Sequence, residues 1–355
     1  MEKRVKKLRQ QMKEDNIEAL LITDSTNRRY VSGFTGTAGF VLITEDTAQL
    51  ITDFRYVTQA QEQAPYFELI RHNGVIWEAV AEQCLKLGVR SLGFEEQQLT
   101  FAHYQELKRH LKRIELTPTS NLVENLRLIK DEQELAILQK AAHIVDRTYD
   151  HILSFLKSGL TEKEVSFELE FTMRKLGATS SSFDTIVASG KRSALPHGVA
   201  SDKRIEAGDF VTLDFGALYE GYCSDITRTV IVGEPSDKQR DIYDIVLAAQ
   251  KRALEQLKPG MTGREADAVA RDYIAEKGYA DYFGHGTGHG LGLNIHEGPT
   301  LSYRSETVLQ PGMVVTVEPG IYIPDFGGVR IEDDVVITES GCRRLTNSSK
   351  ELVIL

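Results

Sequence analysis

The chain has 355 residues and a net charge of −10, with 41% apolar and 26% charged residues, and this length predicts two globular domains. No apolar run is long enough to span a membrane and the charged N-terminus lacks the features of a signal peptide, so we expect a cytoplasmic protein without a membrane partner. The acidic balance argues against a nucleic-acid surface, and the three scattered cysteines exclude a disulfide framework.

Residues 1–122 alternate between helical and strand patterns, which is typical of an α/β domain. An amphipathic segment, RVKKLRQQMKEDNI, precedes a short buried strand, EALLITD, and the segments AGFVLITED and TAQLITDF have the pattern of neighbouring strands. The pattern then predicts a helix in GVIWEAVAEQCLKLGV, followed by a strand and a helix in SLGFEEQQLTFAHYQELKRHL.

A second domain is predicted over residues 131–355. It begins with a long amphipathic helix, which Asp131 can cap while Glu134 reaches back as in a capping box. The segment KSGLTEKE (157–164) matches KPGMTGRE (258–265), and AGDFVTLDFGALY (207–219) matches PGMVVTVEPGIY (311–322). Because two pairs recur in the same order, we expect an α+β domain made of two pseudo-symmetric halves with a cleft between them.

Acidic residues occupy corresponding positions in the two copies. The apolar segments around ALYEGY predict a β-hairpin, with Asp214 on one strand and Asp225 across the turn. The second copy repeats this plan with Glu318 and Glu332. Four desolvated carboxylates cannot all stay charged unless something balances them, because each buried charge costs several kcal/mol. Either most of them hold protons, or two divalent cations neutralise them.

The segment GHGTGHGLGLNIHEGP (284–299) places three histidines among six glycines. Imidazole beside carboxylates suits Mn, Co, Fe or Zn. The glycines are expected to bring one histidine close to the cations through turns that a Cβ would forbid. We expect no helix here, so His285 and His289 do not form the two-ligand face of a helical zinc motif.

These segments resemble the metal-site motifs of the pita-bread metallopeptidases, which include methionyl aminopeptidase, aminopeptidase P and prolidase. The matching segments are LDFGALYEGYCSDITRT, GHGTGHGLGLNIHEGP, TVEPGIY and GGVRIEDDVVIT. The N-terminal half resembles the creatinase-type domain, and its segment YVSGFTGTAGFVLITEDTAQLITDFRY is similar to a stretch of aminopeptidase P. The resemblance implies a creatinase-type α/β domain followed by an α+β pita-bread domain with an internal pseudo-twofold duplication.

The resemblance also implies a site for two divalent metal ions. The implied ligands are Asp214 on one ion, His289 and Glu318 on the other, and Asp225 and Glu332 bridging both. We expect Mn²⁺, with Co²⁺ or Zn²⁺ as alternatives, because a carboxylate-rich ligand set tolerates several ions.

Further catalytic residues are implied by the same resemblance: His197, His285, His296 and Arg330. The histidines are expected to hydrogen bond to the reaction intermediate and to move a proton to the leaving nitrogen. The arginine is expected to orient a carboxylate or to hold the substrate. Thr227 is a candidate donor to Asp225.

The choice of activity depends on the features that distinguish family members. The large N-terminal domain argues against methionyl aminopeptidase, and the complete ligand set argues against creatinase and against a non-catalytic binding protein. Cleavage of an Xaa-Pro bond, an amide without an N–H, remains. The segments FTGTAG and TDFRY favour an Xaa-Pro aminopeptidase acting on proline-containing peptides, with an Xaa-Pro dipeptidase (prolidase) as the alternative. The resemblance also predicts a homodimer.

Overall fold

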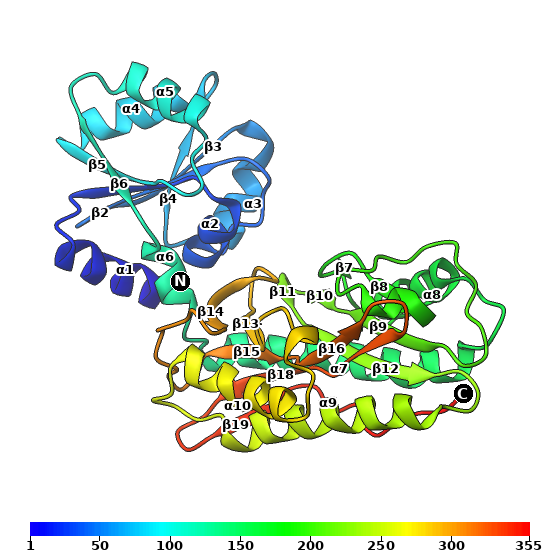
Figure 1. Cartoon of the computed structure of the whole chain (residues 1–355). Coiled ribbons are helices and arrows are strands. Elements are labelled where there is room, and N and C mark those ends of the chain that lie inside the picture. The colour runs from blue at the N-terminus through cyan, green and yellow to red at the C-terminus, as the bar shows by residue number, and fades with distance from the viewer. The chain divides into compact units, whose positions relative to one another are not determined.

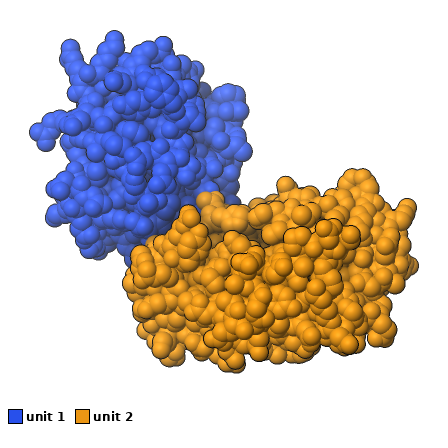
Figure 2. Space-filling model, viewed as in Figure 1, with its two compact units in different colours: residues 1–127 blue, residues 128–355 orange.

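A computed structural model describes all residues from 1 to 355. The chain forms two compact units, residues 1–127 and 128–355, which Figure 2 shows in separate colours. The division falls within the short segment between the two domains expected from the sequence. No helix combines the length and the apolar character that crossing a bilayer requires.

The N-terminal unit is built on a mixed six-stranded sheet with strand order β4-β3-β2-β1-β5-β6. Figure 1 shows α4 and α5 on one face of this sheet and α1, α2 and α6 on the other. The neighbouring strands expected from the sequence are confirmed, since β2 and β3 pair antiparallel. The elements are α1 (Glu2–Glu14), β1 (Ala19–Ile22), α2 (Ser25–Ser32), β2 (Phe40–Thr44), β3 (Ala48–Thr52), η1 (Phe54–Tyr56), α3 (Val57–Gln63), β4 (Glu68–Arg71), α4 (Ile76–Lys86), β5 (Ser91–Glu95), α5 (Phe101–His110), β6 (Glu115–Thr119) and α6 (Leu122–Arg127).

The C-terminal unit consists of two halves, each of which begins with two helices and continues mainly with strands. The first half contains α7 (Glu132–Phe155), α8 (Glu162–Lys175), β7 (Ser180–Ser181), β8 (Ile186–Ser189), η2 (Gly190–Ala194), β9 (Phe210–Phe215), β10 (Ala217–Tyr219), β11 (Tyr222–Cys223) and β12 (Ile226–Ile231). The second contains α9 (Asp237–Gln256), α10 (Gly263–Glu276), η3 (Ala280–Tyr282), β13 (Gly288–Gly290), β14 (Glu297–Leu301), β15 (Val314–Val317), β16 (Gly320–Ile323), β17 (Gly327–Arg330), β18 (Asp333–Ile337) and β19 (Cys342–Arg344).

The predicted duplication is confirmed in the helices and in the strands. Helix α7 packs against α8, and α9 packs against α10. The helices α8 and α10 both begin with a capping box, formed by Thr161 with Glu164 and by Thr262 with Glu265. The outer strands of each hairpin pair antiparallel, β9 with β12 and β15 with β18. The capping box predicted for α7 is also present.

Each half buries its own apolar cluster between its helices and its strands. All six residues of β9 and of β12 are buried, as are all residues of β15 and β18. The four acids expected from the sequence lie at the ends of these buried strands. Asp214 is within β9 and Glu318 directly follows β15, whereas Asp225 and Glu332 directly precede β12 and β18.

Candidate metal centre and active site

A cavity of about 470 Å³ lies within the C-terminal unit. Acidic, imidazole and apolar side chains form its wall. All nine residues selected from the sequence contribute to this wall: His197, Asp214, Asp225, His285, His289, His296, Glu318, Arg330 and Glu332. The fold therefore gathers at one place side chains that both halves of the duplicated unit supply.

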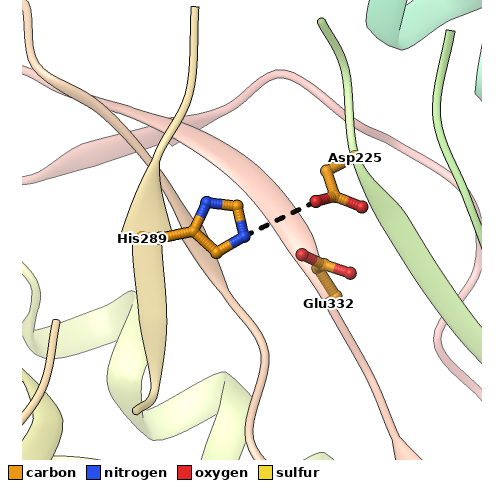
Figure 3. A group of neighbouring side chains, drawn as sticks. All are labelled: Asp225, His289 and Glu332. Atoms are coloured by element: carbon orange, nitrogen blue, oxygen red, sulfur yellow. Dashed lines mark ion pairs between the residues drawn. The ribbon is translucent and has the colours of Figure 1, made fainter. Parts of the chain in front are cut away.

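Three of these side chains form a compact group suited to a metal ion (Figure 3). The potential ligand atoms of Asp225, His289 and Glu332 all lie within 4.8 Å of one another. His289 Nε2 is 3.6 Å from Asp225 Oδ2 and 3.4 Å from Glu318 Oε1. Its Nδ1 lies 3.1 Å from the carbonyl oxygen of Gly290, which can only accept. Nδ1 therefore carries the ring proton, and the Nε2 lone pair faces the carboxylates.

The glycines around His289 act differently from the sequence-based expectation. None of the glycines from 284 to 298 has a positive φ, so they do not form turns that require glycine for its backbone angles. A Cβ on Gly288 would lie 1.9 Å from the Thr316 carbonyl oxygen of β15, and one on Gly290 would lie 2.0 Å from the Gly298 carbonyl oxygen of β14. The glycines thus allow β13 to pass closely between β14 and β15. The expectation that this segment is not helical is confirmed.

The carboxylates of the cavity are buried close to one another. Burial, together with the charge of neighbouring carboxylates, raises the pKa of Asp225 and of Glu332 well above the usual range. Burial likewise raises the pKa of Glu318 to about 7. One oxygen each of Asp214, Asp225 and Glu332 is buried without a hydrogen-bond partner. Because such oxygens need either a proton or a cation, the residues present fit a site for divalent metal ions.

A chain of hydrogen bonds connects Asp214 to His285. Arg330 Nη2 donates to Asp214 Oδ2 at 2.5 Å, and Arg330 Nη1 donates to Tyr322 Oη at 2.8 Å. His285 Nδ1 lies 2.8 Å from the Gly286 carbonyl oxygen and must be the protonated nitrogen, so Tyr322 Oη donates to His285 Nε2, also at 2.8 Å. Burial lowers the pKa of His285 to about 4, which keeps the ring neutral. Both nitrogens of His285 are therefore engaged within the protein.

His197 and His296 differ from His285 because both are exposed where they line the cavity. His197 follows η2 in the segment between β8 and β9, and His296 directly precedes β14. The ring of His296 meets the ring of His289 edge to face, with 4.4 Å between their centroids. Partial burial lowers the pKa of His296. These two imidazoles are the ones that a molecule in the cavity can reach.

Thr227 has a different partner from the one expected. The sequence suggests that it donates to Asp225, but its hydroxyl donates to Glu332 Oε2 at 2.6 Å and accepts from Arg330 Nε at 3.0 Å. The Glu332 backbone N–H also donates to the Thr227 carbonyl oxygen at 3.1 Å. The second hairpin therefore lies against β12 at this point, and Thr227 serves the acid of the opposite half.

Two further residues that support the site were not identified from the sequence. Thr316 accepts from the His289 backbone N–H at 3.0 Å and donates to Glu318 Oε1 at 2.9 Å, so it joins two of the expected ligands. Asp334 Oδ2 accepts from the Asp225 backbone N–H at 2.9 Å. Burial raises the pKa of Asp334 well above the usual range. Thr316 and Glu318 are two positions apart, so strand alternation could have placed them on one face, whereas the Asp334 contact depends on how strands of different sheets meet.

Two family models match the chain and together cover most of it. The model of metallopeptidase family M24 matches residues 136–339, and the model of the creatinase/prolidase N-terminal domain matches residues 4–129. The M24 match therefore includes every residue of the cavity wall.

Relatives of similar length have been named or solved in several organisms. An Xaa-Pro dipeptidase of Pyrococcus horikoshii is 45% identical over 355 residues, which cover 99% of this chain and 99% of that protein. The structure of an Xaa-Pro dipeptidase from Bacillus anthracis is similar with a TM-score of 0.98 at 60% identity, covering 99% of each chain. The structure of an X-Pro aminopeptidase from Thermotoga maritima has a TM-score of 0.92 at 41% identity, covering 98% of this chain and 100% of that one.

Proposed function

This chain belongs to metallopeptidase family M24, and from that premise we propose that it hydrolyses Xaa-Pro dipeptides. The observation that carries the proposal is the likeness, over nearly the full length of both chains, to the Xaa-Pro dipeptidases of P. horikoshii and B. anthracis. The FTGTAG and TDFRY segments favour an aminopeptidase, but the named relatives support the dipeptidase alternative better. A non-catalytic binding protein would be expected to lack metal-binding side chains, and all five are present at the cavity.

We assign the binding of two divalent cations to the five side chains selected from the sequence: Asp214, Asp225, His289, Glu318 and Glu332. Their buried, unpaired oxygens and the Nε2 lone pair of His289 supply donors of the kind these ions take. When bound, the cations would supply a water molecule of lowered pKa and a positive charge for the scissile carbonyl oxygen. Mn²⁺ is proposed first, with Co²⁺ or Zn²⁺ as alternatives.

The remaining residues divide into those that face the cavity and those that hold its wall. We assign hydrogen bonding to the intermediate and proton transfer to the leaving proline nitrogen to His197 and His296, because their rings are exposed to the cavity. His285 is assigned to the wall, since both its nitrogens are engaged. Arg330 donates to three partners and thereby fixes Asp214.

A second candidate is an Xaa-Pro aminopeptidase, and one feature of the cavity favours it. Arg330 is the only lysine or arginine in the cavity wall, and its guanidinium already binds Thr227, Tyr322 and Asp214. A dipeptide carboxylate would therefore have to find its partners among the exposed histidines and the hydroxyls of the wall. The similar X-Pro aminopeptidase structure of T. maritima is consistent with this alternative.

The two candidates are separated by comparing Ala-Pro with Ala-Pro-Ala on the Mn²⁺-loaded protein. A dipeptidase should give a kcat/KM for the dipeptide at least about tenfold higher, because only the dipeptide presents its carboxylate next to the proline ring. Faster cleavage of the tripeptide would establish the aminopeptidase instead. Treatment with EDTA should abolish cleavage of either peptide, and added Mn²⁺ should restore it. Turnover that persists after complete metal removal would exclude both candidates.

A further inference from the structure

A single buried carboxylate holds both ends of the segment that carries His197. Glu162 is the first residue of α8 and is fully buried. Its Oε1 accepts from Ser189 N at 2.7 Å and from Ser189 Oγ at 2.9 Å, at the end of β8. Its Oε2 accepts from Ser201 N at 3.0 Å and from Ser201 Oγ at 2.6 Å. The two residues that flank residues 190–200 are thus bound to the same carboxylate.

Arg192 extends this attachment across the segment. Its Nε donates to Glu162 Oε2 at 3.0 Å, which neutralises the buried charge, and its Nη2 donates to the Val199 carbonyl oxygen at 2.7 Å. The preceding part of the segment has its own anchor, because Gly328 N of β17 donates to Ser193 Oγ at 2.9 Å. The part that depends on Glu162 and Arg192 is therefore residues 195–200, which we term the His197 loop.

The duplication shows that the fold itself does not need this carboxylate. The start of α8 donates from Glu162 N to the Lys203 carbonyl oxygen at 3.0 Å and from Lys163 N to that of Ser201 at 3.1 Å. The start of α10 makes the same pair of bonds, from Gly263 N to the Thr307 carbonyl oxygen at 2.9 Å and from Arg264 N to that of Ser305 at 2.8 Å.

Glycine replaces the acid at the corresponding position of the second half. A Cβ on Gly263 would lie 2.1 Å from the Thr300 carbonyl oxygen, so no side chain fits there. The second half thus attaches its helix without a carboxylate at this position, through the backbone bonds and an exposed ion pair between Arg264 and Glu306. The carboxylate of Glu162 is therefore not needed to attach α8 to the rest of the fold. Its hydrogen bonds to both ends of the segment that carries His197 explain its presence.

The loop has a direct bearing on the cavity. Pro196, His197 and Val199 all belong to the cavity wall. The loop is half exposed, because Leu195 and Val199 are 50% and 53% exposed, and its backbone pairs with the sheet through an isolated bridge between Val199 and Ile186. A polar group that is buried and fully paired holds its neighbours in one arrangement.

We propose that Glu162 and Arg192 are positioning residues that fix the His197 loop, and through it His197, at the cavity. The inference rests on the proposed function only for the role of His197. Because a displacement of about 1 Å can cost roughly a hundredfold in rate, Glu162→Ala should lower kcat/KM for Ala-Pro by about 10- to 100-fold. None of the five proposed ligands forms a hydrogen bond or an ion pair with this loop, so Mn²⁺ affinity should stay within about threefold of the native value.

A double-mutant cycle on the Mn²⁺-loaded enzyme tests the proposal against a merely structural role. Kinetics are measured for the native protein, Glu162→Ala, His197→Ala and the double variant. If Glu162 acts through His197, adding His197→Ala to the Glu162→Ala protein should lower kcat/KM for Ala-Pro by less than about threefold. In the native background the same substitution should lower kcat/KM by far more. If His197→Ala lowers kcat/KM equally in the native protein and in Glu162→Ala, the proposal is overturned.

Hydrogen exchange of the loop gives a readout that does not depend on activity. Glu162→Ala should speed exchange of the Gly198 and Val199 amides at least about tenfold. These amides donate to the carbonyl oxygens of Leu195 and His197, so both hydrogen bonds lie within the His197 loop. Glu164→Ala is the matched control, since Glu164 caps the same helix through Thr161 and does not contact the loop. Unchanged loop exchange in Glu162→Ala, or equal acceleration in Glu164→Ala, would refute the proposal.

A second variant and the exchange measurement cover the two ways in which these experiments could fail. If Glu162→Ala does not fold, Ser201→Ala removes the hydroxyl that donates to Glu162 Oε2 and accepts from Lys203 N, leaves the carboxylate in place, and should still loosen the loop. If the native protein cleaves no Xaa-Pro peptide, the proposed function fails, but the exchange measurement still decides whether Glu162 holds the loop.

Discussion

Single hydroxyl groups control how the acids of the cavity are oriented. The Thr227 hydroxyl donates to Glu332 Oε2 and accepts from Arg330 Nε, so it fixes which oxygen of Glu332 remains unpaired. Thr316 has the same role for Glu318, while it also accepts from the backbone of His289. Each threonine hydroxyl thus binds one oxygen of its carboxylate, and this bond limits the directions in which the second oxygen can point.

We expect Thr227→Val to weaken divalent-metal binding by about 10- to 100-fold, because residues that orient ligands contribute about that much to affinity. The valine keeps the volume but leaves Glu332 Oε2 without its donor. Calorimetric titration of the metal-free protein with Mn²⁺ measures the effect. Thr148→Val is the control, since its buried hydroxyl donates only to the Ile144 carbonyl oxygen within α7. Equal Mn²⁺ affinity in Thr227→Val and the native protein would show that the hydroxyl does not orient Glu332.

The position of β13 depends on having no side chain at Gly288. We expect Gly288→Ala to reduce the free energy of unfolding by about 3 kcal/mol, the upper end for overpacked interiors, because its methyl group would overlap the Thr316 carbonyl oxygen. The shift of β13 should also lower Mn²⁺ affinity, since His289 is the next residue. Gly284→Ala is the control, because Gly284 has open space at its Cβ and no positive φ. Denaturant unfolding of both metal-free variants checks this, and a similar loss in the two would contradict it.

The sequence was informative for elements with strong periodicity and for the duplication. Long amphipathic helices and apolar strands were predicted where they occur, and the recurring segments located the four acids that line the cavity. Short or half-exposed elements were missed, among them β4 with four partly exposed residues and α6 with six residues. Such segments are too short for a period to be measured.

Contacts between strands of different sheets could not be predicted. Thr227 reaches Glu332 across 105 positions, and Arg330 reaches Asp214 across 116. A strand pattern shows which side chains share a face, but not which residue of another sheet meets them. The purpose of the glycines was also misjudged, since their crowding comes from β14 and β15, the neighbouring strands of the same sheet, and not from their own backbone angles.

At the scale of the whole molecule, the buried acids link stability to pH and to cations. The pKa values of Asp225, Glu332 and Glu318 are raised in the folded protein, that of Glu318 to about 7, mainly by burial. The folded state therefore holds protons that the unfolded state releases at lower pH. Their contribution to stability is fully present below the ordinary carboxyl pKa and is lost as the pH rises through the folded-state values.

We therefore expect the melting temperature of the metal-free protein to fall as the pH rises from about 6.5 to 8, because the lowered pKa values of His285 and His296 act in the opposite direction only below the ordinary histidine value of about 6.5. Mn²⁺ should raise it more at pH 8 than at pH 5, because a cation competes with protons for the same oxygens. Calorimetry in EDTA and in excess Mn²⁺ measures both effects. Glu332→Gln removes one buried charge, so its metal-free form should be more stable than the native protein at pH 8 and should depend less on pH. A metal-free melting temperature that rises over this range would mean that these carboxylates are already balanced by groups of the protein itself, and the case for cations in the cavity would then lose its electrostatic basis.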